Sequence, residues 1–243
     1  MISIDINSDV GEGIGNEALL MPLISSCNIA CGGHAGDEKT MREVLAFAKA
    51  YNVKIGAHPS YPDKENFGRS PMDISKNTLQ ESLRNQITIL KNLAEESGLP
   101  LHHIKPHGAL YNKAASDEET AMIVVETVHS IDKNLALYVP YGSLIARLAR
   151  PRLKTIVEGF ADRAYNSDYS LVSRSEYGSV LHDTKQVLTH VLSMVKDEIL
   201  TTRDGENLSF KIDTICVHGD TENALEIVRD LHTELTKQGI QII

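Results

Sequence analysis

The chain has 243 residues, a formal net charge of -9, 42% hydrophobic residues and 23% charged residues. A chain of this length can bury one large core, as single-domain α/β barrels do. An acidic chain lacks the basic surface that nucleic-acid phosphates require. We therefore expect a single domain over residues 1–243 that does not bind nucleic acid, and a local cationic pocket for a small anion stays open.

The N-terminal segment has neither the basic nor the apolar region of a secretory signal, and no apolar run reaches the roughly 18 residues of a membrane span. The three cysteines, Cys27, Cys31 and Cys216, form no disulfide framework. These features predict a cytoplasmic protein without a membrane segment. We expect Cys27 and Cys31 to be structural thiols rather than zinc ligands or the nucleophile of a Cys–His pair.

Short segments rich in Val and Ile, mostly bounded by Gly, Pro or Asp, predict strands. They cover residues 2–7, 25–30, 54–57, 102–105, 135–139, 155–159 and 214–217. Longer segments with apolar residues at helical spacing lie between them. Capping residues begin five of these helices, namely Asp37, Ser75, Ser116 with Glu119 at capping-box spacing, Asp183 and Asp220.

A strand followed by a helix, repeated about seven times, predicts a parallel sheet. The sheet closes into a TIM-like (β/α)7 barrel or stays open as a doubly wound sheet. The barrel is favoured, because polar residues follow many different strands rather than one switch point. The pattern leaves open whether seven or eight strands close the ring. The polar segment 201–213 is expected to be a loop or hairpin that does not disturb the site.

Six segments place ionisable or amide side chains directly after a predicted strand. In chain order these are Asp9 and Glu12; Asn28 and His34; His58; Lys105 and His107; Glu158, Asp162 and Arg163; and His218 and Asp220. In a barrel, such positions meet at one mouth. Carboxylates there act as bases or metal ligands, imidazoles ligate metal or move protons, and Arg69, Lys105 and Arg163 hold a carboxylate or phosphate.

Two glycine-rich stretches, GEGIG at 11–15 and CGGHAG at 31–36, follow the first two strands. Each serves either as an anion-binding nest of N–H groups or as a tight turn. Neither has the third glycine of a dinucleotide motif, and no glycine-rich loop ends in Gly-Lys-Ser/Thr.

Together, seven segments resemble the LamB/YcsF family, the A subunits of 5-oxoprolinases. They are DINSDVGEG, SSCNIACGGHAGD, IGAHPSYPDKENFGR, HIKPHGALYN, EGFADRAY, LVSRSEYGSVL and VHGD, in this order. The longest motif and KPHGALYN are highly specific, and the resemblance runs from about residue 4 to the C-terminus. The weakest match is the variable segment 199–213.

This resemblance implies a (β/α)7 barrel similar to the glycoside hydrolase/deacetylase group. It implies ATP-dependent hydrolysis of 5-oxo-L-proline to L-glutamate in a complex with two partner subunits, B and C. It also carries site positions onto this chain: Asp9, Glu12, Asn28, His34, His58, Arg69, Lys105, His107, Asp162, Arg163, His218 and Asp220.

From the residue types we expect Asp9, Glu12, His58, His107 and Asp162 to be catalytic, and Asn28, Arg69, Lys105, Arg163, His218 and Asp220 to bind substrate. Asp9 or Glu12 activates water, and His58 or His107 protonates the leaving nitrogen. A divalent metal, if required, has Asp9, His34 and His58 as candidate ligands. ATP binds at the glycine-rich turns, or a partner subunit performs the phosphorylation.

Two alternatives remain. The first is a metal-dependent deacetylase or related carbohydrate hydrolase on the same barrel, although the absence of tryptophan and 5% aromatic residues argue against sugar stacking. The second is a non-catalytic subunit that binds a small carboxylate, although six charged strand ends exceed what carboxylate binding requires.

Overall fold

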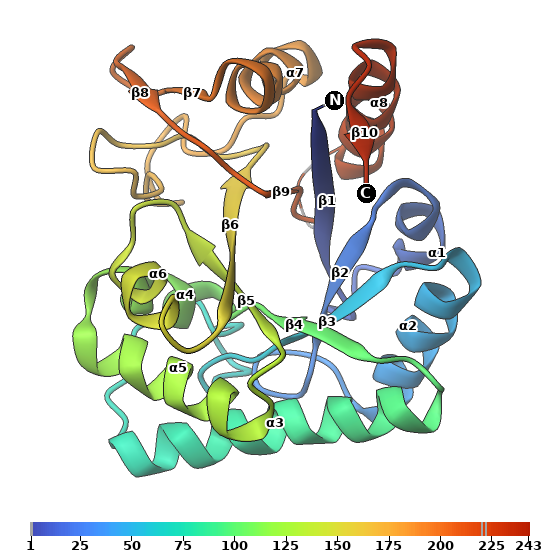
Figure 1. The fold of residues 1–243 in the computed structure, drawn as a ribbon, viewed down its shortest axis with the longest axis vertical. Coiled ribbons are helices and arrows are strands. Elements are labelled where there is room, and N and C mark those ends of the chain that lie inside the picture. Colours follow the sequence, from blue (N-terminus) through green and yellow to red (C-terminus); the bar gives the residue numbers. More distant parts are fainter. Residues whose placement is uncertain (1, 220, 222) are drawn as a thin grey trace.

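Seven parallel strands form a closed barrel in the computed structural model, which describes residues 2–219, 221 and 223–243 (Figure 1). The barrel strands are β1 (Ser3–Val10), β2 (Ser26–Ala30), β3 (Lys54–His58), β4 (Leu101–Ile104), β5 (Ala136–Pro140), β6 (Lys154–Phe160) and β9 (Thr214–Cys216). The ring closes because β1 pairs with β2 on one side and with β9 on the other. The predicted barrel is confirmed, the open sheet is excluded, and the ring has seven strands.

A further short strand, β10 (Gln241–Ile242), pairs with the start of β1 and stays outside the ring. It brings the C-terminal end of the chain beside the N-terminal end of β1, at the upper right of Figure 1. β7 (Ile199–Thr201) and β8 (Asn207–Ser209) form a separate antiparallel hairpin in the polar segment where a loop or hairpin was expected.

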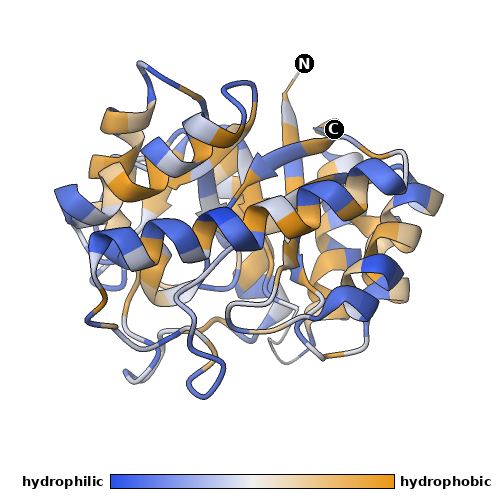
Figure 2. Ribbon diagram, turned by 90° about the horizontal axis from the view of Figure 1, so that it is seen from below, coloured by the Kyte–Doolittle hydropathy of each residue, from blue (hydrophilic) through white to orange (hydrophobic). Residues whose placement is uncertain are grey.

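Helices surround the barrel. They are α1 (Glu17–Leu20), α2 (Glu38–Tyr51), α3 (Lys76–Glu96), α4 (Gly108–Ser116), α5 (Glu118–Ile131), α6 (Leu144–Ala149), α7 (Thr184–Leu192) and α8 (Ala224–Lys237), with a 3-10 turn, η1 (Met21–Leu23), and a π-turn, η2 (Ser193–Asp197). Figure 2 shows hydrophilic residues on their outer faces and hydrophobic residues toward the barrel. Within the described residues, none of these helices has the length and apolarity to cross a membrane.

Three predicted helix caps are confirmed: the side chains of Asp37, Ser75 and Asp183 each accept a backbone N–H from the first turn. The predicted capping box at Ser116 is wrong. Ser116 ends α4, a short helix that the periodicity did not reveal. Asp117 caps α5 instead, because its extended backbone lets its carboxylate accept the Thr120 N–H at 2.9 Å. Asp220, the predicted start of the last helix, lies outside the described residues.

The interior of the barrel is polar, because alternate residues of each strand point inward. In β1 the inward residues are Asp5, Asn7 and Asp9, whereas the intervening Ile4 and Ile6 are buried in the apolar core. Three hydrogen-bonded groups follow one another up the interior: Asp5 with Ser26 and Thr214, Asn7 with Asn28 and Glu158, and Asp9 with Asn28 and Lys105. We call this set the polar column. It leads to the mouth of the barrel.

Candidate active site

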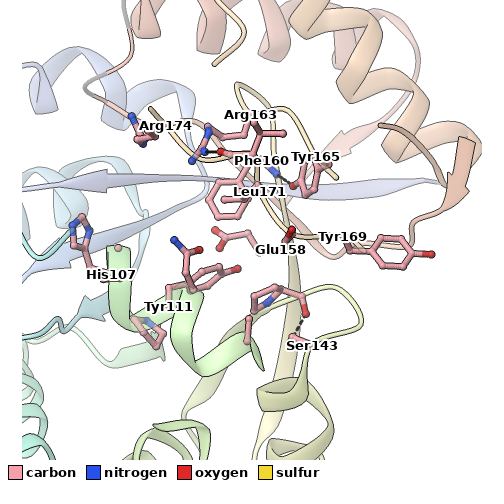
Figure 3. A pocket seen from close by; sticks show the side chains of 18 of the residues that line it. His107, Tyr111, Ser143, Glu158, Phe160, Arg163, Tyr165, Tyr169, Leu171 and Arg174 are labelled. Atoms are coloured by element: carbon pink, nitrogen blue, oxygen red, sulfur yellow. Dashed lines mark hydrogen bonds between the residues drawn. The ribbon is translucent and has the colours of Figure 1, made fainter. Parts of the chain in front are cut away.

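A cavity of about 600 Å³ lies at the carboxyl ends of the barrel strands. Its lining comes from the ends of β1, β3, β4, β5, β6 and β9, from α4 and from segment 168–175. Figure 3 shows Glu158 and Tyr111 facing the cavity, with Arg163 and Arg174 nearby. The barrel therefore brings together side chains that are far apart in the sequence. Seven of the predicted site residues line the cavity: Asp9, His58, Arg69, Lys105, His107, Arg163 and His218.

Lys105 lies between two carboxylates in the cavity wall. Its ammonium nitrogen is 3.0 Å from Asp9 Oδ1, 2.9 Å from Glu158 Oε1 and 3.0 Å from Cys216 Sγ. Burial by itself lowers the pKa of Lys105, but the Asp9 and Glu158 carboxylates outweigh it and hold the pKa well above its ordinary value. The side chain is therefore a fixed cation whose donors are taken up by protein groups.

Asp9 is buried and ionised. Burial raises its pKa, but His58 and Lys105 oppose burial and hold the pKa well below its usual range. Asn28 donates to Asp9 Oδ1 at 2.8 Å, and His103, stacked on a tyrosine below, lies 2.8 Å from Asn28 Oδ1. The amide of Asn28 is thus fixed from below, and its nitrogen donates both to Asp9 and to Asn7 Oδ1. Asn28 supports the carboxylate and does not line the cavity.

Glu158 lines the cavity, and it was expected at the mouth but was given neither a catalytic nor a binding role. Its Oε1 atom accepts from Lys105 and Asn7, whereas its buried Oε2 atom has no hydrogen-bond partner within the described residues. The buried hydroxyl of Tyr111 makes no hydrogen bond of standard geometry there but lies beside Glu158, and burial and that carboxylate raise the pKa of Tyr111 well above the ordinary value. Sequence analysis placed Glu158 at the mouth without a role, and its inward position within β6 is what brings it to Lys105.

Asp162 and His218 form a buried pair at the cavity edge. His218 Nδ1 is 2.9 Å from Asp162 Oδ1, and Thr221 also donates to the carboxylate. Burial raises the pKa of Asp162, but His218 and Thr221 outweigh it and lower the pKa to about 2. The carboxylate accepts the Nδ1–H of His218 and so orients the ring with its Nε2 atom away from Asp162. The structure thus places His218 at the cavity and Asp162 behind it, whereas we expected Asp162 to be the catalytic member.

Arg163 is buried and lines the cavity, but two of its N–H groups donate to the backbone carbonyls of Ser179 and Val172. It therefore also holds the segment that forms one wall. Arg69 is exposed, lines the cavity and packs over the Phe67 ring at 4.9 Å. Arg174, which was not in the predicted set, is a further exposed cation in the lining.

Four side chains beside the cavity form a second group, which we call the histidine cluster: Glu12, His34, His58 and His107. Glu12 Oε1 is 2.9 Å from His34 Nε2 and 3.5 Å from His107 Nδ1. Burial lowers the pKa of both His34 and His107, so both rings are neutral near pH 7. The cluster contains two of the predicted metal candidates. Asp9, the third, falls in a separate group with Cys216 and His218.

The long motif GAHPSYPDKENFGR closes over this cluster. Phe67 and Gly68 both adopt positive φ, and Phe67 offers its carbonyl to His107 Nε2 at 3.0 Å. A Cβ atom on Gly68 would lie 3.0 Å from His34 Cβ, so only glycine fits comfortably there. The turn CGGHAG has a similar packing role, because a Cβ on Gly33 would lie 2.3 Å from Gln86 Oε1.

The LamB/YcsF family profile matches residues 4–243 of this chain. The 5-oxoprolinase A subunit of Haemophilus influenzae (strain PittEE) is 43% identical over 243 residues, which cover 100% of this chain and 99% of the relative. The crystal structure of the lactam utilization protein from Thermus thermophilus superposes with a TM-score of 0.92 at 36% identity, covering 99% of each chain.

The barrel itself is shared more widely. A GH18 chitinase from Pseudoalteromonas aurantia matches with a TM-score of 0.56 at 9% identity, covering 95% of this chain and 100% of the other. This likeness shows the fold alone and agrees with the expected glycoside hydrolase-like barrel. Because both the profile and the 43% identical relative extend over essentially the whole sequence, the chain belongs to the LamB/YcsF family.

Proposed function

We propose that this chain is the A subunit of a 5-oxoprolinase and that its cavity opens the lactam ring of 5-oxo-L-proline to give L-glutamate. The full-length relatives named as 5-oxoprolinase A subunits support this. The observation that carries the proposal is the cavity with Asp9, Lys105 and Glu158 on one wall and an Asp162–His218 pair at its edge. Such a site suits proton transfer to and from a small amide.

The substrate offers a carboxylate, a lactam N–H and a lactam carbonyl. Two exposed guanidinium groups in the lining, Arg69 and Arg174, suit the carboxylate, because a guanidinium matches it with two parallel hydrogen bonds. Glu158 Oε2 and the Tyr111 hydroxyl, both buried without a hydrogen bond of standard geometry within the described residues, suit the lactam N–H and carbonyl. Lys105 already contacts two carboxylates, so we assign it to holding Asp9 and Glu158 in place.

Ring opening forms a bond from water oxygen to the lactam carbon, breaks the carbon–nitrogen bond and moves one proton from water to nitrogen. His218 carries that proton in our proposal, because Asp162 holds its Nδ1–H and leaves Nε2 to accept and release it. Asp9 stays ionised and orients the water. This assignment gives His218 the proton-transfer role that the sequence had suggested for His58 or His107.

ATP enters as co-substrate, since an amide carbonyl is a poor electrophile. Phosphorylation of the lactam oxygen, with release of ADP, makes the carbon reactive toward water. Ring opening then gives γ-glutamyl phosphate, and a second water cleaves it to glutamate and inorganic phosphate. We assign the phosphorylation to the partner subunits B and C, because this chain has no glycine-rich loop ending in Gly-Lys-Ser/Thr. The need for ATP also suits a reaction in the cytoplasm.

The test is a glutamate-release assay with 5-oxoproline and ATP, with this chain alone, with subunits B and C alone, and with all three. We expect glutamate only from the complete mixture. Glutamate release by B and C at the same rate without this chain would contradict the proposal. Calorimetric titration of the isolated chain with ATP tests the division of labour, because stoichiometric binding would move the nucleotide site onto this chain.

The alternative of a metal-dependent deacetylase is favoured by one observation, the histidine cluster beside the cavity. It predicts acetate release from N-acetylated saccharides by this chain without ATP. The same preparations, assayed for acetate, distinguish the two functions.

A further inference from the structure

The histidine cluster has the composition of a metal site. Its four members come from four segments: the turn after β1 (Glu12), the turn after β2 (His34), the end of β3 (His58) and the residue before α4 (His107). One ligand atom from each lies within 4.8 Å of all the others. Imidazole nitrogens and a carboxylate oxygen in this number suit Zn²⁺ and related first-row ions.

The outer nitrogens of two rings are fixed by backbone carbonyls. His58 Nδ1 lies 2.7 Å from the Lys105 carbonyl, and His107 Nε2 lies 3.0 Å from the Phe67 carbonyl. A carbonyl oxygen only accepts, so both of these nitrogens carry hydrogen. Histidines that ligate a metal are typically held in this way, with the outer N–H on a carbonyl and the inner nitrogen toward the ion.

The inner nitrogens of the same rings point at each other. His58 Nε2 is 2.9 Å from His107 Nδ1, and Glu12 Oε1 lies 3.9 Å and 3.5 Å from them, respectively. In neutral rings both of these nitrogens are lone-pair acceptors, and so is the carboxylate oxygen. Three acceptors therefore face one point, and a positive charge is needed between them.

The third histidine completes the set and makes it rigid. His34 stacks on His107 with 3.7 Å between ring centroids and 4° between planes, and its Nε2 atom is 2.9 Å from Glu12 Oε1. The Phe67 ring packs edge-on against both rings. All three histidines are at most 4% exposed, so the cluster is preformed and shielded from water.

We propose that Glu12, His34, His58 and His107 bind one divalent transition-metal ion, with Zn²⁺ as the ion to test. The set differs from the predicted candidates in that Glu12 and His107 replace Asp9. Asp9 lies just outside, with Oδ2 3.3 Å from His58 Nε2, so the ion and the cavity share a wall. The role of the ion in catalysis rests on the proposed function, in which it would supply positive charge beside the lactam. The binding of the ion does not depend on the proposed function.

The test is metal binding by the full chain, first treated with chelator and then titrated with Zn²⁺ by calorimetry, with metal content measured by mass spectrometry. We expect one equivalent for the wild type. Glu12→Gln and His107→Asn should each weaken binding by more than about 100-fold, because losing a ligand costs more than losing an outer-shell partner. The matched control is His129→Asn, which removes an exposed histidine on α5 and should bind as the wild type does.

Substitution with Co²⁺ gives a readout independent of turnover, since its visible spectrum reports nitrogen and oxygen ligands. Circular dichroism checks that each variant is folded, and Glu12→Gln, on a turn, tests the site if His107→Asn does not fold. Absence of stoichiometric Zn²⁺ or Co²⁺ binding by the wild type, or unchanged binding in folded Glu12→Gln, would overturn the proposal. A wild-type chain that binds one equivalent of metal but releases no glutamate with its partners and ATP would instead count against the proposed function alone.

Discussion

The polar residues inside this barrel are held by ion pairs and hydrogen bonds with one another. Lys105 stands between Asp9 and Glu158, and all three side chains are buried. Buried charges persist only when they are paired, because removing one partner leaves the others desolvated without compensation. The polar column is thus a set of mutually dependent groups, and its members should tolerate substitution poorly.

Replacing Lys105 with Met tests this dependence. The change keeps the volume and removes the cation, so we expect the free energy of unfolding to fall by about 3–5 kcal/mol. Urea denaturation measures it. An unchanged urea midpoint would contradict this prediction, because it would show that the fold tolerates Asp9 and Glu158 without the ammonium of Lys105.

The Asp162–His218 pair gives a second prediction at this scale. Asp162→Asn keeps the shape but allows the wrong tautomer of His218, so turnover should fall by about 10²–10⁴-fold while substrate binding changes little. The reconstituted glutamate assay measures kcat and KM separately. Asp204→Asn, in the exposed β7–β8 turn, is the matched control. If Asp162→Asn lowered kcat as little as Asp204→Asn does, the Asp162–His218 pair would have no catalytic role.

At the scale of elements, helix starts and strands could be predicted because their signals are local. Asp37 and Asp183 are followed by apolar stripes, and the strands fall within a few residues of their expected positions. The short helices α4 and α6 were missed, since nine and six residues show too few turns of periodicity. The ends of these two helices depend on contacts with neighbouring elements, and a local sequence pattern does not show such contacts.

Helix α7 carries a pH-sensitive element. Burial lowers the pKa of His190 to about 4, and its Nε2 atom is buried without a partner within the described residues. In the unfolded chain this pKa is about 6.5, so between pH 6.5 and 4 the unfolded state binds more protons and stability falls as pH falls. We expect His190→Gln to flatten this decline in urea unfolding between pH 7 and 4.5. A parallel decline in wild type and variant would contradict the assignment.

At the scale of the whole molecule, the sequence predicted that scattered polar residues meet at one mouth, because parallel strands in a barrel align their carboxyl ends. It did not predict which of them touch. Glu158 was expected at the mouth but received no role, because a strand position alone does not show that it contacts Lys105. The grouping of Glu12 with His107 depends on how the turn at Phe67 and Gly68 folds over His34. Such contacts between distant segments arise from packing, which spacing along the chain does not encode.

The central claim is that this cavity opens the lactam ring, and Asp9→Asn in the glutamate-release assay with both partners present tests it most directly. The change nearly preserves size while removing the charge that faces Lys105 and His58. We predict that a folded Asp9→Asn chain, in complex with its partners and supplied with ATP, releases no measurable glutamate from 5-oxoproline. Glutamate release at the wild-type rate would contradict the account.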